Sequence, residues 1–192
     1  MTVIAIPGFS GQRLSIVTIG GGDGVPAWQR MFGWPAGDSV AVPLAAQSAH
    51  ERTIWAARLD RAVREAESRV LLVADGLGCA ASAWWARLSP ADDVGKVAGA
   101  LLFAPPRVPN PLFASPRAHL PFPSLVIQPD GADDDLAAAV ADWGSRLVVG
   151  GRVRDRRAGA VAWRQAQRLF LRLTSQMVEH EVDRQRAITG WR

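Results

Sequence analysis

The stretch LLVADGLGCAASAWWA, residues 71–86, decides how the chain is interpreted. It opens with the apolar run Leu71–Ala74, and such a run is typical of a strand buried on both faces. Glycines at 76 and 78 favour a tight turn, because glycine adopts backbone angles that side chains disfavour. Small and aromatic residues then follow at helical spacing. The stretch therefore predicts a strand, a tight turn and a helix, with Gly76 at the apex of the turn.

The rest of the chain repeats this alternation of apolar runs and helical patterns. Strands are predicted at Val3–Ile6, Ser15–Ile19, Ser39–Val42, Arg69–Ala74, Val97–Ala104, Ser124–Gln128 and Arg146–Val149. Helices are predicted at Pro26–Phe32, Gln47–Ala66, Gly78–Arg87, Asp133–Trp143 and Ala160–Arg186. Strands separated by helices indicate an α/β fold with a mostly parallel sheet and helices on both faces.

One domain is expected, because 192 residues suffice for one core and no linker divides the chain. Residues 1–151 form its expected core, and residues 152–192 a basic helical extension packed on the same domain. The proline-rich segment Pro105–Pro123 is expected to be an ordered loop without regular structure.

Composition limits the cellular compartment and the kinds of cross-link or metal site that are expected for this protein. No apolar run approaches the roughly 20 residues of a membrane span, and the N-terminus does not resemble a signal peptide. Cys79 is the only cysteine, so an intrachain disulfide and a cysteine metal cluster are both excluded. No cofactor is implied. We expect a cytoplasmic protein.

Charge is concentrated near the C-terminus. From residue 146 onward the chain holds eleven arginines and four acidic residues, a net charge of +7, against −3 for the rest. A basic segment can bind nucleic acid, an acidic lipid surface or an acidic protein, and it can also be a solvated helix face. No nucleic-acid motif accompanies the charge, so the solvated face is preferred to nucleic acid.

The predicted helix 160–186 is unusually apolar. Its apolar residues cover an arc of about 220° on a helical wheel, where packing on one sheet needs only about 100° or a little more. Two surfaces are therefore possible for this helix. One is the domain's own sheet, and the other is a partner protein, a second copy of the chain or a membrane surface. Aromatic residues and arginine are favoured at protein interfaces. The partner-binding candidates are Trp163, Arg164, Arg168, Phe170, Arg172 and Met177.

Several stretches of the chain are distinctive in their order: VLLVADGLGCAASAWWA (70–86), GALLFAPPRVPNPLF (99–113), LPFPSLVIQPD (120–130) and WGSRLVVGG (143–151), preceded by GGGDGVPAWQRMF (20–32). Together they resemble the YdeN-like small serine hydrolases, the family of retinoblastoma-binding protein nine. The resemblance covers about residues 15–151. It implies a single-domain α/β-hydrolase fold and, in active members, a Ser-Asp-His triad with esterase-type activity.

The triad positions implied by this resemblance are degenerate here. The nucleophile position holds Gly76, and the histidine position after the last strand holds Arg152. The acid position falls near Ala132, with Asp130 or Asp133 as alternatives. Acyl transfer needs a nucleophile and a base. Glycine has no side chain to attack with, and arginine does not release its proton near neutral pH.

The chain offers few replacements for these groups. Cys79 is expected to pack against the sheet, and Ser82 to point away from the site. Ser10 lies in a glycine turn without an obvious base. Of the three histidines, His119 is the best substitute base, because the proline-rich loop that carries it is expected to cover the site. The acidic run Asp133–Asp135 is interpreted first as a helix N-terminus, and no metal site is expected.

The backbone of the old site can persist without catalysis. Candidate ligand-pocket residues are Gly21, Gly22, Asp75, Gly76, Leu77 and Arg152, whose amides and guanidinium suit a small anion. Two purely structural glycine turns are the preferred alternative. We expect an inactive pseudo-hydrolase that binds a protein or assembles with itself. The alternative is an esterase-type hydrolase with a rebuilt site using Cys79 or a loop serine.

Overall fold

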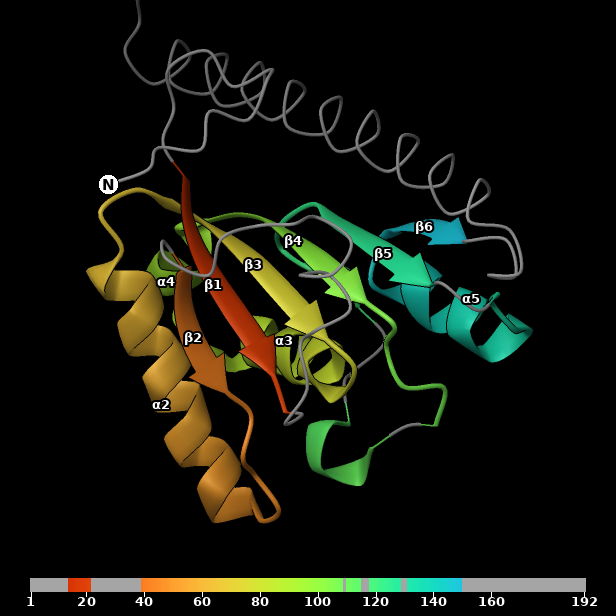
Figure 1. The fold of residues 1–192 in the computed structure, drawn as a ribbon, viewed down its shortest axis with the longest axis horizontal. Coiled ribbons are helices and arrows are strands. Elements are labelled where there is room, and N and C mark those ends of the chain that lie inside the picture. Colours follow the sequence, from red (N-terminus) through yellow and green to blue (C-terminus); the bar gives the residue numbers. More distant parts are fainter. Residues whose placement is uncertain (1–13, 22–38, 109, 115–117, 129–130, 150–192) are drawn as a thin grey trace, which may run out of the picture.

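The computed structural model describes residues 14–21, 39–108, 110–114, 118–128 and 131–149. These residues form a six-stranded sheet in the order β2-β1-β3-β4-β5-β6, flanked by helices (Figure 1). The strands are β1 Leu14–Gly20, β2 Ser39–Pro43, β3 Arg69–Asp75, β4 Val97–Phe103, β5 Ser124–Gln128 and β6 Arg146–Val149. All five pairings between them are parallel. The six strands confirm the predicted positions to within one residue at each end.

Helix α2, Ala49–Glu65, begins at a capping box. The Ser48 hydroxyl accepts a hydrogen bond of 3.2 Å from the Glu51 amide, and the Glu51 carboxylate accepts one of 3.0 Å from the Ser48 amide. The pair satisfies two amides that the first helical turn leaves without partners. The helix lies within the predicted Gln47–Ala66.

The other described helices are α3 Leu77–Leu88, α4 Ala91–Gly95 and α5 Asp134–Asp142. The first and third confirm the predictions Gly78–Arg87 and Asp133–Trp143. The short α4 was not predicted, because five residues are too few to show a helical period. The predictions Val3–Ile6, Pro26–Phe32 and Ala160–Arg186 lie outside the described residues, as does the extension 152–192.

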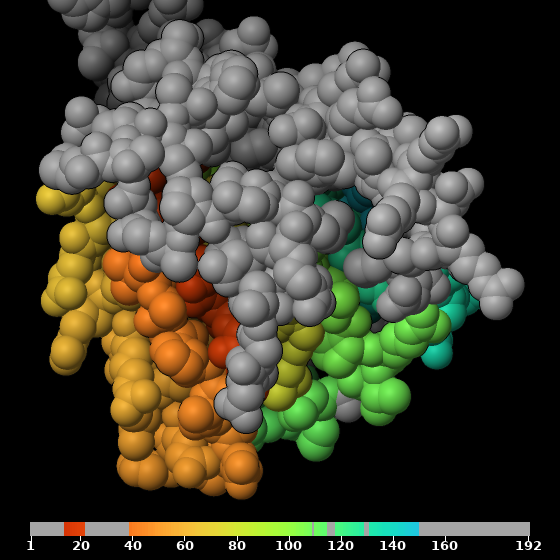
Figure 2. Space-filling model, in the orientation of Figure 1, coloured from red at the N-terminus to blue at the C-terminus, as the bar shows by residue number. Residues whose placement is uncertain are grey.

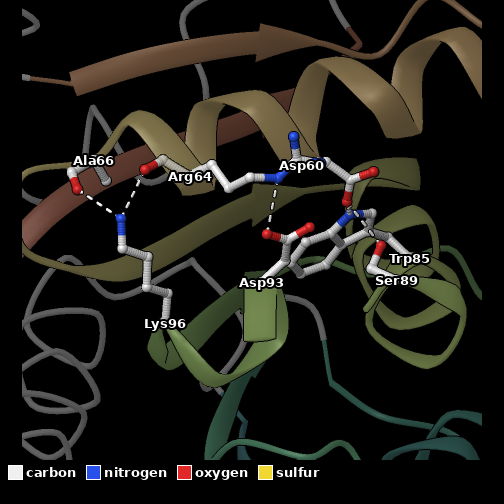
Figure 3. A network of polar contacts seen from close by, with 7 residues as sticks. All are labelled: Asp60, Arg64, Ala66, Trp85, Ser89, Asp93 and Lys96. Atoms are coloured by element: carbon white, nitrogen blue, oxygen red, sulfur yellow. Dashed lines mark hydrogen bonds and ion pairs between the residues drawn. The ribbon is translucent and has the colours of Figure 1, made fainter. Parts of the chain in front are cut away.

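A polar network ties three of these helices together (Figure 3). Asp60 of α2 accepts hydrogen bonds at Oδ1 from the Trp85 indole, 2.7 Å, and from the Ser89 hydroxyl, 2.9 Å. Arg64 pairs with the largely buried Asp93 of α4 at 2.9 Å. These contacts fix α2 against α3 and α4 at the end of α3 farthest from its first turn.

Lys96, the only lysine, completes the network. Its ammonium donates hydrogen bonds to the carbonyls of Arg64, 2.7 Å, and Ala66, 2.9 Å. A helix leaves its last carbonyls without partners, and a cation there stabilises them. Lys96 therefore closes the C-terminal end of α2.

The expectation that Pro105–Pro123 holds no regular structure is wrong. Residues Pro111–Phe113 form a 3-10 helix, η2, capped by the Asn110 side chain, which accepts a hydrogen bond of 2.9 Å from the Leu112 amide. Proline at the first helical position has its φ preset for such a turn. Phe113 packs edge-on against Trp55 and Trp84, and this burial holds the turn on the domain.

The two faces of the sheet carry two apolar clusters. One cluster includes side chains from every described helix. Large buried residues such as Trp55, Leu59 and Trp85 pack there with the strand residues Val17 and Leu72. In Figure 1, α3, α4 and α5 lie behind the sheet as drawn. The other cluster consists of strand residues alone. The sequence predicted helices on both faces of the sheet. The described residues place helices on one of them.

The surface view shows where the described elements reach solvent. The orange area of Figure 2 belongs to β2 and α2, and the green area includes the segment around η2. Within the described ranges, no helix combines the length and apolar character needed to cross a membrane.

Candidate functional site

The turn between β3 and α3 has the backbone geometry of a nucleophile elbow. Gly76 has φ 55° and ψ −124°, a conformation that a residue with a Cβ adopts only under strain. Its amide donates a hydrogen bond of 2.9 Å to the Phe103 carbonyl, and its own carbonyl accepts one of 3.1 Å from Cys79. The sharp strand-to-helix turn expected from the sequence is confirmed. What the turn lacks is a side chain at its apex.

Space for such a side chain is present. A Cβ built on Gly76 meets no atom of the described residues within 4 Å. In an elbow of this kind the apex side chain projects above the carboxyl edge of the sheet. The glycine is therefore not required by crowding, and only its φ favours it.

Gly78, two residues later, is required by crowding. A Cβ there would lie 2.6 Å from the carbonyl oxygen of Ile19 in β1. Helix α3 can start this close to the sheet only because position 78 has no side chain. Glycine is therefore favoured at the two positions for different reasons. At position 76 the reason is the positive φ, and at position 78 it is the close packing of α3 against β1.

Gly21 lies beside this turn, at the carboxyl end of the neighbouring strand. Ile19 pairs with Ala74, which sets Gly20 level with Asp75. A Cβ on Gly21 would lie 3.0 Å from the Leu44 carbonyl, and the Leu44 amide donates a 2.9 Å hydrogen bond to Gly20. Four pocket candidates, Gly21, Asp75, Gly76 and Leu77, therefore gather at one edge of the sheet. Gly22 and Arg152 lie outside the described residues.

The first turn of α3 keeps donors directed to this edge. Gly76 occupies its N-cap position, and no side chain caps it. A helix leaves its first amides without internal partners, and these amides attract negative charge. The acidic Asp75, which takes part in a polar interaction of its own, stands next to them. The edge thus combines amide donors with a carboxylate.

Cys79 is not an accessible nucleophile. It is fully buried, and its thiol donates to the carbonyls of Phe103, at 3.3 Å, and Ala74, at 3.6 Å. Burial, together with the charge of Asp75, raises the pKa of the Cys79 thiol well above its usual value. Because the thiolate is the reactive form, this environment suppresses nucleophilic attack. The rebuilt site based on Cys79 is therefore contradicted, and the expectation that Cys79 packs against the sheet is confirmed.

Ser82 is also occupied within the fold. Its side chain is buried, and its hydroxyl donates a 2.7 Å hydrogen bond to the Gly78 carbonyl one turn earlier. This back-bonding is common for serine in helices. The hydroxyl does not reach the carboxyl edge, as expected. Ser10 lies outside the described residues.

The family's acid is expected in the loop after β5. The described carboxylates of that loop have a structural role. Asp133 caps α5 by accepting a 2.9 Å hydrogen bond from the Leu136 amide, and Asp134 and Asp135 follow in the first turn. The interpretation of the run as a helix N-terminus is confirmed. Ala132 precedes this cap, exposed and without a polar side chain, and Asp130 lies outside the described residues.

An arginine that the sequence did not single out holds the same loop. Arg107, in the segment after β4, pairs with the Asp133 carboxylate at 3.3 Å and donates to the Gly131 carbonyl at 3.3 Å. Both side chains are about half exposed, so the ion pair adds little to the stability of the fold. Its main effect is to hold the loop after β5 in position. No sequence signal points to Arg107, because its two partners are 24 and 26 residues away.

Gln128 at the end of β5 was also missed. It is 5% exposed, and its Oε1 has no hydrogen-bond partner among the described residues. A buried amide oxygen without a partner costs about 1–3 kcal/mol. Its only sequence signal is a polar residue closing an otherwise apolar strand.

The expectation that His119 lies over the site is wrong. The Leu120 amide donates to Trp143, and the His119 ring lies against Gly144, just before β6 begins. These residues belong to the amino edge of the parallel sheet, opposite the elbow. The proline-rich segment returns to that edge because it must enter β5 there, so a base at 119 cannot serve Gly76. His50 lies in the first turn of α2 and is exposed, and His180 lies outside the described residues.

Metal ligation finds no support in this part of the chain. Within the described ranges, no group of three or more histidine, cysteine, aspartate or glutamate side chains is placed to hold an ion.

Comparison with known proteins identifies the fold. A family model described as serine hydrolase matches residues 20–172. The match extends past residue 151, where the expected resemblance ended. No curated protein matches the chain.

Solved structures agree with this match. A YdeN-like hydrolase of Pectobacterium atrosepticum is 17% identical, with a TM-score of 0.57 over 85% of this chain and 92% of that chain. Brefeldin A esterase, a bacterial homologue of human hormone sensitive lipase, is 12% identical, with a TM-score of 0.52 over 86% of this chain and 70% of that chain. At these identities the likeness concerns the fold alone.

The family model spans most of the chain, and the sheet order and the elbow have the form that the fold requires. The chain therefore belongs to the serine hydrolase family and has the α/β-hydrolase fold.

Proposed function

We propose that this chain is a non-catalytic member of the serine hydrolase family that acts as a protein-binding module. The observation that carries the proposal is Gly76, which holds the elbow backbone at φ 55° and ψ −124° but has no side chain. Covalent catalysis by this fold begins with attack by the apex side chain. Glycine leaves that first step without a reactant.

The other members of a triad are compromised as well. In the sequence, Arg152 stands where the family's histidine is expected, and an arginine is not a base near neutral pH. Asp133, the described alternative for the acid, is engaged by the Leu136 amide and by Arg107. The substitutes Cys79 and Ser82 are buried. Restoring catalysis would need several coordinated changes.

Chemical labelling tests the absence of catalysis. We expect the wild-type chain to show neither fluorophosphonate labelling nor turnover of p-nitrophenyl acetate above a denatured sample. Gly76→Ser should gain no turnover, because the expected histidine position holds Arg152, which is not a base near neutral pH. Gly76→Ser/Arg152→His serves as the matched control, since it restores two triad members. Stoichiometric labelling of the wild-type chain, mapped to a residue such as Ser10, would overturn the proposal.

The binding role is proposed from the basic C-terminal region. Its six candidates are Trp163, Arg164, Arg168, Phe170, Arg172 and Met177, and the expected partner is another protein or a second copy of the chain. An N-terminally tagged chain purified from its native host should bring down a stoichiometric partner. Reversing the charge at Arg164, Arg168 and Arg172 should abolish that binding and leave the thermal unfolding temperature unchanged.

Binding measurements with anionic vesicles and with nucleic acid separate the competing classes of partner. Binding to anionic vesicles or to nucleic acid, lost steeply as salt is added, would assign the basic region to those surfaces instead. Binding that survives the triple charge reversal would remove these arginines from the interface.

A further inference from the structure

Helices α2 and α3 hold η2 in a socket formed by Arg52, Trp55 and Trp84. The Arg52 guanidinium lies over the Trp84 ring, 4.5 Å from its centroid, and donates a 2.6 Å hydrogen bond from Nη1 to the Leu112 carbonyl. The buried Phe113 ring has its centroid 5.8 Å from that of Trp55 and 6.0 Å from that of Trp84. The turn therefore places a carbonyl oxygen on a cation and an aromatic ring against two tryptophans.

The socket contains two buried donors that have no acceptor among the described residues, Arg52 Nε and Trp55 Nε1. The two residues lie three apart on α2, so their side chains share one side of the helix. A guanidinium and an indole can only donate hydrogen bonds. Buried donors without an acceptor are rare in native proteins. The socket thus presents more donors than η2 supplies acceptors.

The carboxylate nearest in the sequence does not supply the missing acceptor. Glu51, next to Arg52 in α2, accepts hydrogen bonds from the Gln47 and Ser48 amides at 2.7 and 3.0 Å. Arg52 forms no ion pair with any carboxylate of the described residues. A carboxylate binds a guanidinium more strongly than a neutral carbonyl does, through two parallel hydrogen bonds. A carboxylate would therefore satisfy Arg52 better than the Leu112 carbonyl.

The turn that fills the socket is short and lies at the surface. Pro111, its first residue, and Ala114, which follows it, are exposed, and the segment reaches solvent in Figure 2. The same segment starts at Ala104, the one described residue with a side chain and a positive φ, 45°. Strained backbone of this kind concentrates at ligand clamps and switch regions. We therefore expect η2 to leave the socket without unfolding of the sheet.

We propose that the socket binds a small carboxylic acid with an apolar chain or ring when η2 moves out. The carboxylate takes the place of the Leu112 carbonyl on Arg52 and accepts a hydrogen bond from the Trp55 indole. The apolar group takes the place of the Phe113 ring. The turn η2 is then an internal competitor for the ligand. The proposal needs no protein partner, so it stands independently of the proposed function.

Hydrogen exchange of the intact chain tests the displacement of η2, with 4-phenylbutyrate as the probe. Its methylene chain has the length of the link from the Leu112 carbonyl carbon to the Phe113 ring, through the Phe113 nitrogen, Cα and Cβ. The Leu112 and Phe113 amides donate to Oδ1 and to the carbonyl of Asn110, at 2.9 and 3.0 Å.

The saturating probe should speed exchange of these two amides at least about 10-fold, because it stabilises the state in which η2 is out. A turn of three residues does not persist without the packing that holds it. Unchanged exchange at saturation would overturn the proposal.

Two variants on α2 separate the socket from a general effect of charge. Arg52→Gln should weaken calorimetric binding of 4-phenylbutyrate at least about 10-fold, because the guanidinium is lost. Arg58→Gln is the matched control, since Arg58 is exposed on the same helix and the variant loses the same charge. It should bind like the wild type. Should Arg52→Gln not fold, Arg52→Lys replaces it, because an ammonium lacks the bidentate geometry. Equal binding by the Arg52 and Arg58 variants would overturn the proposal.

The neutral analogue 4-phenylbutanol tests the need for a carboxylate. Phe113→Leu weakens the internal competitor and should bind 4-phenylbutyrate more tightly than the wild type does. Both proteins should bind the alcohol at least about 10-fold more weakly than the acid. Equal binding of alcohol and acid would show an apolar cavity only and overturn the proposal. The absence of binding by both proteins, each shown by thermal unfolding to be folded, would also overturn it.

Discussion

Gly78 in the first turn of α3 approaches Ile19 of β1 so closely that a Cβ at 78 would lie 2.6 Å from the Ile19 carbonyl oxygen. The obstructing atom belongs to the backbone of a buried strand, so it cannot move aside. This contact sets how near the elbow lies to the sheet. The apex residue of the same turn, Gly76, carries no side chain.

Gly78→Ala is expected to destabilise the chain by about 1–3 kcal/mol, the usual cost of overpacking a core. Urea unfolding followed by tryptophan fluorescence measures the loss. Gly95→Ala is the matched control, because a Cβ there meets nothing within 4 Å in the part of the chain that the structure describes. A loss at position 78 no larger than that at position 95 would show that α3 can shift away from β1.

Gly76→Ala should cost about 1–3 kcal/mol for a different reason, the strain of a Cβ at φ 55°. Gly76→Ser should cost a similar amount, since the space above the turn accepts either side chain. The same urea titration gives both values. A variant as stable as the wild type would mean that glycine at the apex is not selected by the backbone angle.

Cys79 should be unreactive to Ellman's reagent in the native chain and should react at once in urea. Its raised pKa adds a dependence on pH. The folded chain keeps the thiol neutral, whereas the unfolded chain ionises it near pH 9. Stability from this group is therefore complete below pH 9 and falls as pH rises further. Comparing the wild type with Cys79→Ala between pH 7 and 10 isolates the effect, and parallel curves would contradict it.

Asp60→Ala should destabilise the chain by about 1–3 kcal/mol, because it leaves the Trp85 indole and the Ser89 hydroxyl without their shared acceptor. Asp60→Asn is the conservative control, since its amide oxygen can still accept both hydrogen bonds. The midpoints of urea unfolding compare the two. If Asp60→Asn is as damaging as Asp60→Ala, the carboxylate charge matters more than the hydrogen bonds.

The capping box at α2 predicts a loss of stability in acid. Hydrogen bonds from Gln47 and then Ser48 lower the pKa of the Glu51 carboxyl from its ordinary value of 4.5. A carboxyl whose pKa is lowered on folding stabilises the chain above its unfolded pKa, and this stability disappears as pH falls through the folded value. Glu51→Gln should flatten the stability curve below about pH 4.5. If Glu51→Gln leaves the loss of stability below about pH 4.5 unchanged, other groups cause the acid sensitivity.

Much of the fold follows from the sequence alone. The apolar runs of β3, β4 and β5 predicted buried strands because parallel strands covered on both faces have no polar alternation. The elbow was predictable because a glycine pair between such a strand and a helical pattern leaves few conformations open. Helices of nine or more residues were found, and the five-residue α4 and three-residue η2 were not, because short segments depend on the surroundings that bury them.

The sequence determined the strands, the elbow and the glycine at its apex, since each depends on residues adjacent in the chain. Tertiary structure alone decided the rest. It put His119 at the edge opposite Gly76, Arg107 against Asp133, and the Cys79 thiol between two strand carbonyls. These relationships join residues brought together by the sheet order, and local periodicity carries no information about which edge a returning loop will reach.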